Sequence, residues 1–271
     1  MDILTAPFIT DMVNIMSHMY RKGWNERNGG NISYLLDKTE LGAYLDTTQV
    51  LRTFDIAFDM SPLVGKYFVV TGSGRYFKNV HTHTAEVLGV VHVQAPHQLA
   101  LLWGLDNQTQ PTSELPTHFM SHIARLAVDP HNRVVMHCHA THLISMSFAH
   151  DPHEDALTKT LWEMCTECIV VFPDGVGVIP WIVPGTTAIG NATASKIATH
   201  RLVLWPFHGI YGAGRDIDET YGLIETAEKA AQVYTYMMSQ GGKQQTITDQ
   251  ELQDLADAFG VVPRAGILKL G

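Results

Sequence analysis

Apolar residues along this chain recur with two different spacings, and each spacing predicts a type of secondary structure. Residues 8–23 carry apolar side chains three or four positions apart, which predicts an amphipathic helix that ends before Gly23. Short apolar runs rich in Val, Ile and Leu, separated by Gly, Pro, Asp and Asn, predict strands. These runs cover residues 31–36, 67–71, 87–93, 99–103, 132–138, 168–172, 176–182 and 202–205. Short strands therefore dominate the middle of the chain.

Further helical segments interrupt the strands and follow them. They cover residues 113–127, 141–149, 154–163, 187–199 and 217–239. Ser113 is a candidate N-cap for the first of these, and Pro116 lies in its first turn. The last and longest begins at Asp216 or Asp218 as the cap and ends before the glycine pair at 241–242.

The pair Asp174-Gly175 lies between two of the apolar runs and is typical of a tight hairpin turn. Hairpins join antiparallel strands, so we expect an α/β fold in which helices cover a mostly antiparallel central sheet. Residues 37–62 are the least regular stretch, and we interpret them as an insertion between early strands. No repeat and no linker composition marks a boundary, so we expect a single domain over residues 1–271.

The composition of the chain limits the classes of partner that it is expected to bind. The 271 residues include 18 Lys and Arg against 27 Asp and Glu, for a formal net charge of -9. Nucleic acids and membrane surfaces attract clustered basic residues, so we expect neither as a partner. The N-terminus lacks the layout of a signal peptide, and no apolar run is long enough for a membrane helix. Three cysteines fit a reducing compartment, so we expect a cytoplasmic protein.

Three histidines form a candidate metal site. In the run RVVMHCHA the two-residue period of a strand places His137 and His139 on one face and Cys138 on the other. Zinc sites usually need a third protein ligand, and His208 is the best candidate because it follows an apolar strand at a turn whose glycine permits close approach of backbone. The alternative is a packed strand whose imidazoles bond to backbone. Other candidates are His142 and the pair at 81–83, which follows a loop and is interpreted as solvated.

Cys165 and Cys168 have the spacing of a redox or zinc motif. Without a second cysteine pair they cannot complete a structural site of four ligands. We interpret both as buried thiols.

Three segments have compositions suited to an anion. They are Asn28, Gly29, Gly30 and Asn31 before a strand, Thr71, Gly72, Ser73 and Gly74 after a strand, and Thr112 and Ser113 before a helix. Glycines and hydroxyls of this kind can expose backbone N–H groups, and a helix N-terminus favours negative charge. Each segment alone is more often an ordinary turn, but together they could surround one phosphate.

Two carboxylates are candidates for moving a proton. Glu114 follows the hydroxyl pair at 112–113, where it could equally be a helix-start carboxylate that complements the dipole. Glu167 precedes an apolar run, where a surface carboxylate is the alternative. Sequence spacing by itself brings neither residue to the histidines.

The chain resembles, almost from end to end, the metal-dependent class II sugar-phosphate aldolases of the L-fuculose and L-rhamnulose phosphate aldolase family. The similar segments are GWNERNGGNIS (23–33), VTGSGRYF (70–77), LLWGL (101–105), PTSELPTHFMSH (111–122), VVMHCHATHLI (134–144), LWEMCTECIVVFPDGVGVIPW (161–181), LVLWPFHG (202–209) and DETYGLIETAEKAAQV (218–233). These segments and the insertion at 37–62 are more similar to the rhamnulose branch than to the shorter fuculose branch.

The resemblance implies one Zn2+ per subunit on His137, His139 and His208, with Glu114 as the acid–base residue. It implies a phosphate pocket built from Asn28, Gly29, Gly30, Asn31, Ser73, Gly74, Thr112 and Ser113. It further implies a homotetramer with active sites near subunit borders, where Glu167 is similar to a carboxylate that a neighbouring subunit contributes.

The implied reaction is reversible retro-aldol cleavage of a small-molecule substrate, L-rhamnulose 1-phosphate, to dihydroxyacetone phosphate and L-lactaldehyde. Zinc would act as a Lewis acid in this reaction. Pentulose-phosphate 4-epimerases, a thiosugar-phosphate dehydratase and fuculose-phosphate aldolases resemble the same family and remain alternatives. Adducin-like head domains are a non-catalytic alternative, but they lack working metal ligands, whereas three histidines and Glu114 are present here.

Overall fold

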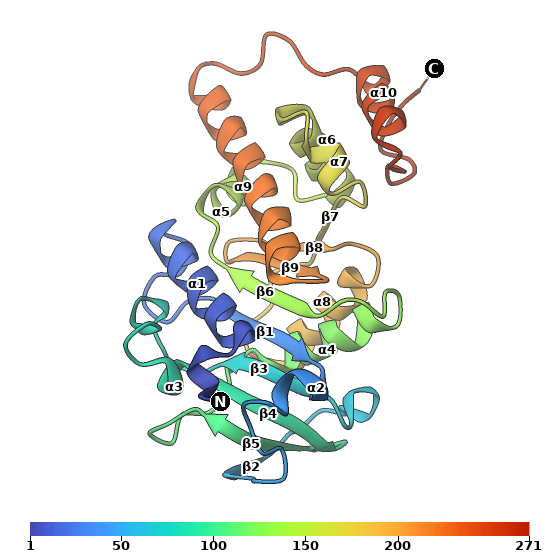
Figure 1. Ribbon diagram of the computed structural model, residues 1–271. Coiled ribbons are helices and arrows are strands. Elements are labelled where there is room, and N and C mark those ends of the chain that lie inside the picture. Colours follow the sequence, from blue (N-terminus) through green and yellow to red (C-terminus); the bar gives the residue numbers. More distant parts are fainter. Residues whose placement is uncertain (271) are drawn as a thin grey trace.

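A nine-stranded sheet runs through the molecule in the order β2-β5-β4-β3-β1-β6-β9-β8-β7, as the computed structural model of residues 1–270 shows (Figure 1). The strands are β1 (Asn31–Leu36), β2 (Arg52–Asp55), β3 (Tyr67–Thr71), β4 (Leu88–Ala95), β5 (Gln98–Gly104), β6 (Val134–Cys138), β7 (Val176–Val178), β8 (Leu202–Trp205) and β9 (Gly209–Gly214). Neighbouring strands are antiparallel except for β7 and β8, which are parallel. The sheet is therefore mixed, although mostly antiparallel as expected.

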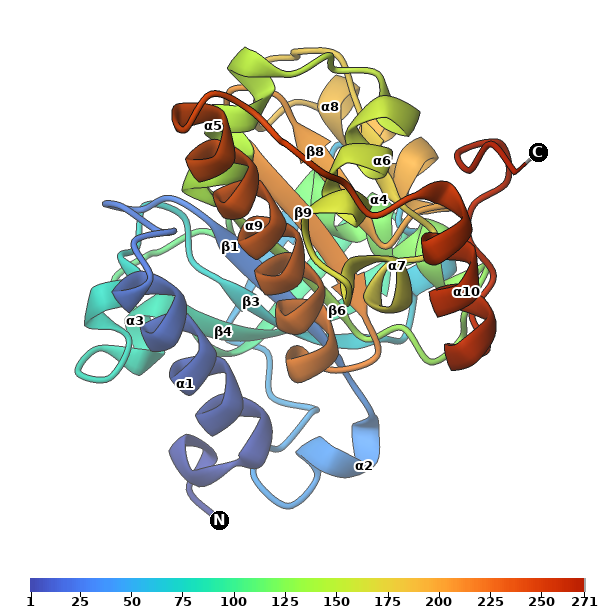
Figure 2. The same ribbon diagram turned by 90° about the horizontal axis from the view of Figure 1, so that it is seen from above.

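Helices cover both faces of this sheet. They are α1 (Pro7–Arg21), α2 (Lys38–Leu41), α3 (Thr84–Val87), α4 (Leu115–Leu126), α5 (Thr141–Ala149), α6 (Glu154–Met164), α7 (Cys168–Val171), α8 (Thr187–Ile197), α9 (Ile217–Ser239) and α10 (Asp249–Phe259), with short 3-10 helices η1 (Ile3–Thr5), η2 (Ser61–Leu63) and η3 (Phe77–Asn79). Helices α1 and α9 lie along one face, and α4 and α8 lie behind the opposite face (Figure 2). Among the described residues, no helix is both long and apolar enough to cross a bilayer.

The alternation of side chains in β6 divides the core between the two faces. Met136 and Cys138 pack in the large cluster under α1, α5 and α9. Val135 points the other way, where it packs with residues of α8 such as Ile189. Because side chains alternate along a strand, the buried His137 shares the α8 side with Val135.

One strand prediction is wrong, and it changes the sheet. Residues 168–171 form the single-turn helix α7 and not a strand. A short apolar run cannot be distinguished from a buried helix by spacing alone. The turn at Asp174-Gly175 therefore joins a helix to β7 and does not make a hairpin, although Gly175 has the left-handed φ of 75° that a tight turn needs.

Other elements differ from the prediction or were not foreseen. The stretch at 37–62 is not outside the sheet, since it contains α2 and supplies β2, which pairs with β5 at the sheet edge. Strand β9 and helix α10 were missed, and helix α4 begins at Leu115, with Glu114 and not Ser113 at its N-cap. The single domain over residues 1–271 stays a prediction.

Candidate functional site

Three histidine side chains converge where β6 ends. His137 lies in β6, His139 follows it directly, and His208 lies in the turn between β8 and β9. One ligand atom from each of the three lies within 4.8 Å of the other two. The ring of His137 is 5.3 Å from the ring of His139 and 5.0 Å from that of His208. Three imidazoles this close together can converge on one metal ion.

Hydrogen bonds orient two of the three imidazoles. His137 Nδ1 donates to the carbonyl of Ile210 at 3.0 Å, so its Nε2 carries a lone pair. This Nε2 is buried and has no hydrogen-bond partner among residues 1–270. His139 Nδ1 lies 2.8 Å from Glu26 Oε1, which orients that ring in the same way. A ligand imidazole usually donates its second nitrogen to a carboxylate or carbonyl, as both rings do here.

The environment keeps His137 and His208 neutral. Burial, with the neighbouring His139 and His208, holds the pKa of His137 well below its usual range. Burial and His139 lower the pKa of His208 to about 4. A neutral imidazole with an unpaired buried nitrogen is the form that binds a metal, so these residues fit one.

The turn that carries His208 brings two backbones unusually close. Gly209 lies against β6, and a Cβ at this position would be only 2.3 Å from the carbonyl oxygen of Cys138. Phe207 has φ 67°, a left-handed conformation that bulky residues rarely adopt. The expectation that glycine permits close approach here is therefore confirmed, and the approach places His208 beside His137.

Glu114 lies next to the cluster, at the start of α4. Its side chain is buried, with 8% of the residue exposed, and its Oε2 is 3.8 Å from His137 Nε2. The same Oε2 accepts hydrogen bonds from Asn31 Nδ2 at 3.0 Å and from the Tyr211 hydroxyl at 2.5 Å. Burial raises the pKa of Glu114, and these two hydrogen bonds oppose the rise. Its side chain makes no capping bond to the helix, so it is not an ordinary N-cap carboxylate.

The two hydroxyl-bearing segments form adjacent loops. The backbone N–H of Thr112 donates to the carbonyl of Thr71 at 2.9 Å, and that of Ser73 donates to the carbonyl of Gln110 at 2.8 Å. Thr112 is buried, whereas Ser113 and Gly74 are exposed. Main-chain pairing thus brings together segments that are about forty positions apart in the sequence.

The glycine loop at 28–31 packs on His139 and bonds through Asn31 to Glu114. Gly29 packs on His139, since a Cβ at Gly29 would be 2.7 Å from Cε1 of that ring. Gly30 has a left-handed φ of 74°. Asn28 is exposed, whereas Asn31 is buried and its amide bonds inside the protein.

Glu167 lies apart from this constellation. Its side chain is exposed and accepts a hydrogen bond from Cys165 Sγ at 2.8 Å. It lines a cavity of about 550 Å3 together with Lys22 and His142, and none of the three clustered histidines lines that cavity. Cys168 is buried as expected, but Cys165 is only partly buried.

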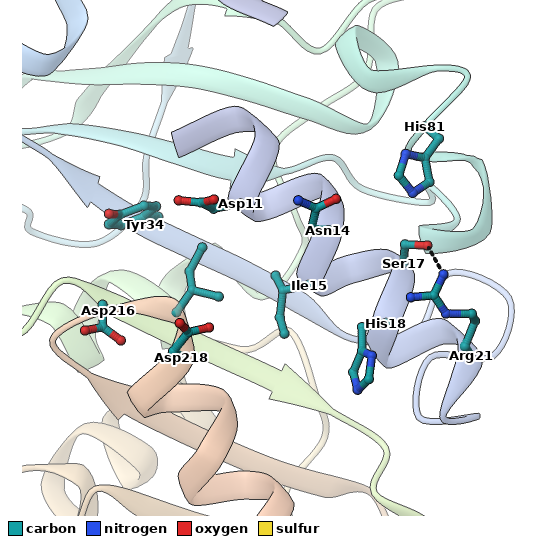
Figure 3. Close-up of a pocket in the computed structure, with 11 residues that line it drawn as sticks. Asp11, Asn14, Ile15, Ser17, His18, Arg21, Tyr34, His81, Asp216 and Asp218 are labelled. Carbon is teal, nitrogen blue, oxygen red and sulfur yellow. Dashed lines mark hydrogen bonds between the residues drawn. The ribbon is translucent and has the colours of Figure 1, made fainter. Parts of the chain in front are cut away.

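A second cavity, of about 600 Å3, opens between α1, β1 and the start of α9 (Figure 3). None of the three clustered histidines, Glu114 or the residues of the expected phosphate pocket lines it. The exposed His81 lies at its edge, which agrees with the interpretation of the 81–83 pair as solvated. The polar residues that line it are Asp11, Asn14, Ser17, His18, Arg21, Tyr34, His81, Asp216 and Asp218.

Among the residues that contact the site, sequence reasoning missed Glu26, His118 and Tyr211. Glu26 bonds to His139, and His118 bonds to Asn31. Tyr211 pairs directly with His137 across β6 and β9, and its ring stacks on that imidazole at 4.4 Å. The register of two strands reveals this contact, and no spacing within one segment does.

Comparison with known families then identifies the class of protein. Residues 10–235 match the family model described as class II aldolase and adducin N-terminal domain. The match spans most of the chain, so the chain belongs to this family.

Relatives and a solved structure are similar over nearly the whole length. The rhamnulose-1-phosphate aldolase of Enterococcus faecalis is 62% identical over 270 residues, which cover 99% of this chain and 97% of the relative. The rhamnulose-1-phosphate aldolase of Listeria monocytogenes is 60% identical over 268 residues, which cover 98% of each chain. The crystal structure of a sugar-phosphate aldolase from Thermotoga maritima superimposes with a TM-score of 0.75 at 27% identity and covers 87% of this chain and 96% of that one.

Proposed function

We propose that this protein is a metal-dependent aldolase that reversibly cleaves L-rhamnulose 1-phosphate to dihydroxyacetone phosphate and L-lactaldehyde. Relatives that carry the name rhamnulose-1-phosphate aldolase at 60–62% identity support the choice of substrate. The observation that carries the proposal is the buried Nε2 of His137, which has no hydrogen-bond partner in the described part of the chain and lies beside two further imidazoles and the carboxylate of Glu114.

The metal in this proposal is zinc, one ion per subunit, held by His137, His139 and His208. The unpaired Nε2 of His137 and the lowered pKa of His208 support this ligand set. When bound there, zinc supplies Lewis acidity that stabilises negative charge on the substrate oxygens.

Glu114 moves the proton in this proposal. Its carboxylate lies next to the cluster and is largely shielded from water, and burial raises its pKa toward the range that suits a general acid and base. In the condensation direction it takes a proton from the carbon of dihydroxyacetone phosphate that becomes the nucleophile, and in cleavage it returns that proton.

The phosphate pocket of the proposal uses neutral donors. Its residues are Asn28, Gly29 and Gly30, from the loop that packs on His139, and Ser73, Gly74, Thr112 and Ser113, from two loops joined by main-chain hydrogen bonds. The N-terminus of α4, which follows Ser113, adds a favourable dipole for an anion. Asn31 belongs to the same loop, but its amide already bonds to Glu114.

The proposal extends to the assembly. We propose a homotetramer in the cytoplasm, in which the exposed Glu167 acts at the site of a neighbouring subunit. Glu167 is free for this role because it does not line the histidine site of its own chain.

The test is an assay of purified protein with L-rhamnulose 1-phosphate, in which release of dihydroxyacetone phosphate is measured before and after chelation. We expect chelation to abolish cleavage and added zinc to restore it, with L-fuculose 1-phosphate as the weaker substrate. Full activity of metal-free protein, or trapping of the substrate on a lysine by borohydride, would disprove the metal mechanism. Faster cleavage of L-fuculose 1-phosphate would reassign the substrate.

A further inference from the structure

A continuous row of buried polar side chains leads from Glu114 into the core. Asn31 Oδ1 lies 2.5 Å from His118 Nε2, and His118 Nδ1 lies 2.8 Å from Ser33 Oγ. Ser33 Oγ in turn lies 2.8 Å from Nε2 of His122. Ser33 and both histidines have no exposed surface, and Asn31 is 7% exposed.

The chemistry of these groups fixes the direction of every hydrogen bond in the row. The amide oxygen of Asn31 can only accept, so His118 Nε2 must carry the proton. Burial lowers the pKa of His118 to about 3, so the ring is neutral and its Nδ1 is an acceptor. Ser33 must then donate to His118 and accept from His122.

The same logic orients the amide of Asn31. With its oxygen bonded to His118, its Nδ2 faces Glu114 and donates to Oε2. Without that bond the amide could turn over, and its oxygen would then face a carboxylate. His118 and the carboxylate of Glu114 thus favour the same orientation of Asn31, with its oxygen toward His118 and its Nδ2 toward Glu114.

Both donors to Glu114 bond to one oxygen. Asn31 and Tyr211 donate to Oε2, whereas Oε1 accepts no hydrogen bond from residues 1–270. Two donors on Oε2 fix the plane of the carboxylate and leave the lone pairs of Oε1 for another molecule.

We propose that His118 is a positioning residue, which orients the Asn31 amide so that Glu114 is held by Oε2 and presents Oε1 to the substrate. The inference rests on the proposed role of Glu114 as the base.

Filling the core with this row of polar side chains reduces the stability of the fold. Among residues 1–270, His122 Nδ1 is buried without a hydrogen-bond partner, and an unpaired buried acceptor is destabilising. Apolar residues at these positions would avoid that cost, whereas a connected polar row sets a unique orientation. The row ends at Glu114, so Glu114 is the side chain that it orients.

Four variants of the zinc-loaded enzyme test the proposal through kcat, KM and zinc content. His118→Leu removes the donor, and His118→Gln retains an amide N–H that can reach Asn31. His122→Leu is the matched control, because it removes an equally buried imidazole from the same helix and leaves the bond between His118 and Asn31 intact. Glu114→Gln reports on the base itself.

We expect His118→Leu to lower kcat about 10–100-fold, the usual effect of losing an orienting partner, with KM and zinc content close to those of the parent. His118→Gln should recover most of that loss, and His122→Leu should stay within about threefold of the parent. An unchanged kcat in His118→Leu, or an equal loss in His122→Leu, overturns the proposal. If Glu114→Gln retains its kcat, the proposed base role fails instead.

A spectroscopic measurement tests the proposal on the unaltered protein, so its outcome does not depend on whether a variant folds. Nitrogen NMR of metal-free protein labelled at histidine reports which ring nitrogen carries the proton. We expect His118 and His122 as Nε2–H tautomers and His137 as the Nδ1–H tautomer. An Nδ1–H tautomer at His118 would overturn the proposal, because Nε2 could not then donate to Asn31.

Discussion

Glu114 is held by uncharged donors, and this allows its charge to be removed without disturbing its place. Glu114→Gln keeps the size of the side chain and an oxygen that can still accept from Asn31 or Tyr211. We expect kcat to fall by about 10²–10⁴, the usual contribution of general base catalysis, with little change in KM. Zinc content, measured by elemental analysis on the same preparation, should stay at one per subunit. Near-normal turnover would instead make Glu167 the next candidate for the base.

Replacing His208 should remove the bound metal as well as the activity. His208→Ala leaves His137 and His139, which are too few protein ligands for a stable zinc site. Metal and activity should therefore disappear together, whereas Glu114→Gln loses only turnover. Exposed His81 provides the control, since His81→Ala should change neither quantity. A His208→Ala protein that retains its zinc would remove this residue from the ligand set.

At the level of single residues, the sequence predicts contacts only where one segment contains both partners. The alternation in VVMHCHA was enough to place His137 and His139 on one face. The contact of Tyr211 with Glu114 could not be predicted, because it depends on the register of β6 with β9 and on the docking of α4. The roles of all these residues in catalysis stay predictions.

Among the elements, α5 depends on a residue of another helix for its N-terminus. Ala140 at its N-cap offers no side-chain bond, and Glu228 of α9 accepts instead from the backbone N–H groups of His142 and Leu143, each at 2.9 Å. The carboxylate is buried, with 5% of the residue exposed.

Glu228→Ala should therefore destabilise the protein. It leaves backbone donors of α5 without their acceptor, which costs about 1–3 kcal/mol. The measurement is denaturant unfolding at fixed protein concentration. Glu225→Ala on the same helix is the control, because its ion pair with Lys22 is about 45% exposed and should contribute about 1 kcal/mol or less. Equal losses in the two variants would contradict a special role for Glu228.

Some helices were foreseen at both ends, whereas other elements show what the spacing of apolar residues cannot reveal. The predicted helices at 141–149 and 217–239 agree with α5 and α9 at both ends. The run at 168–172 predicted a strand because all five of its residues are apolar, but a helical turn buries apolar residues equally well. Strand β9 was missed because three of its six residues are glycines, which close packing against β6 and α9 requires.

For the molecule as a whole, the order of strands explains why distant segments share one site. Strands β1, β6 and β9 are neighbours at the middle of the sheet and carry Asn31, His137 and Tyr211. Helix α4, which begins beside Glu114, covers this part of the sheet from one face. Strand order depends on contacts between remote parts of the chain. The position of the Glu114 carboxylate therefore could not be predicted from the sequence.

The buried histidines should make the stability of the whole molecule depend on pH. Burial lowers the pKa of His118 and of His122 to about 3, whereas an unfolded histidine titrates near 6.5. Between these values the unfolded chain binds more protons than the folded one. The contribution of these two histidines to stability is therefore fully present above pH 6.5 and is lost as the pH falls below it.

His122→Leu isolates one of these two contributions. At pH 5.0 one such histidine costs about 2 kcal/mol of unfolding free energy relative to pH 7.5, since each pH unit below 6.5 costs about 1.36 kcal/mol. Carboxylates titrate in both proteins, so they cancel in the comparison. The loss of stability from pH 7.5 to pH 5.0 should thus be about 2 kcal/mol smaller in the variant, measured by denaturant unfolding of metal-free protein at both pH values. The same pH dependence in parent and variant would mean that His122 accepts a proton in the folded state, which its unpaired Nδ1 would then have to hold in the core.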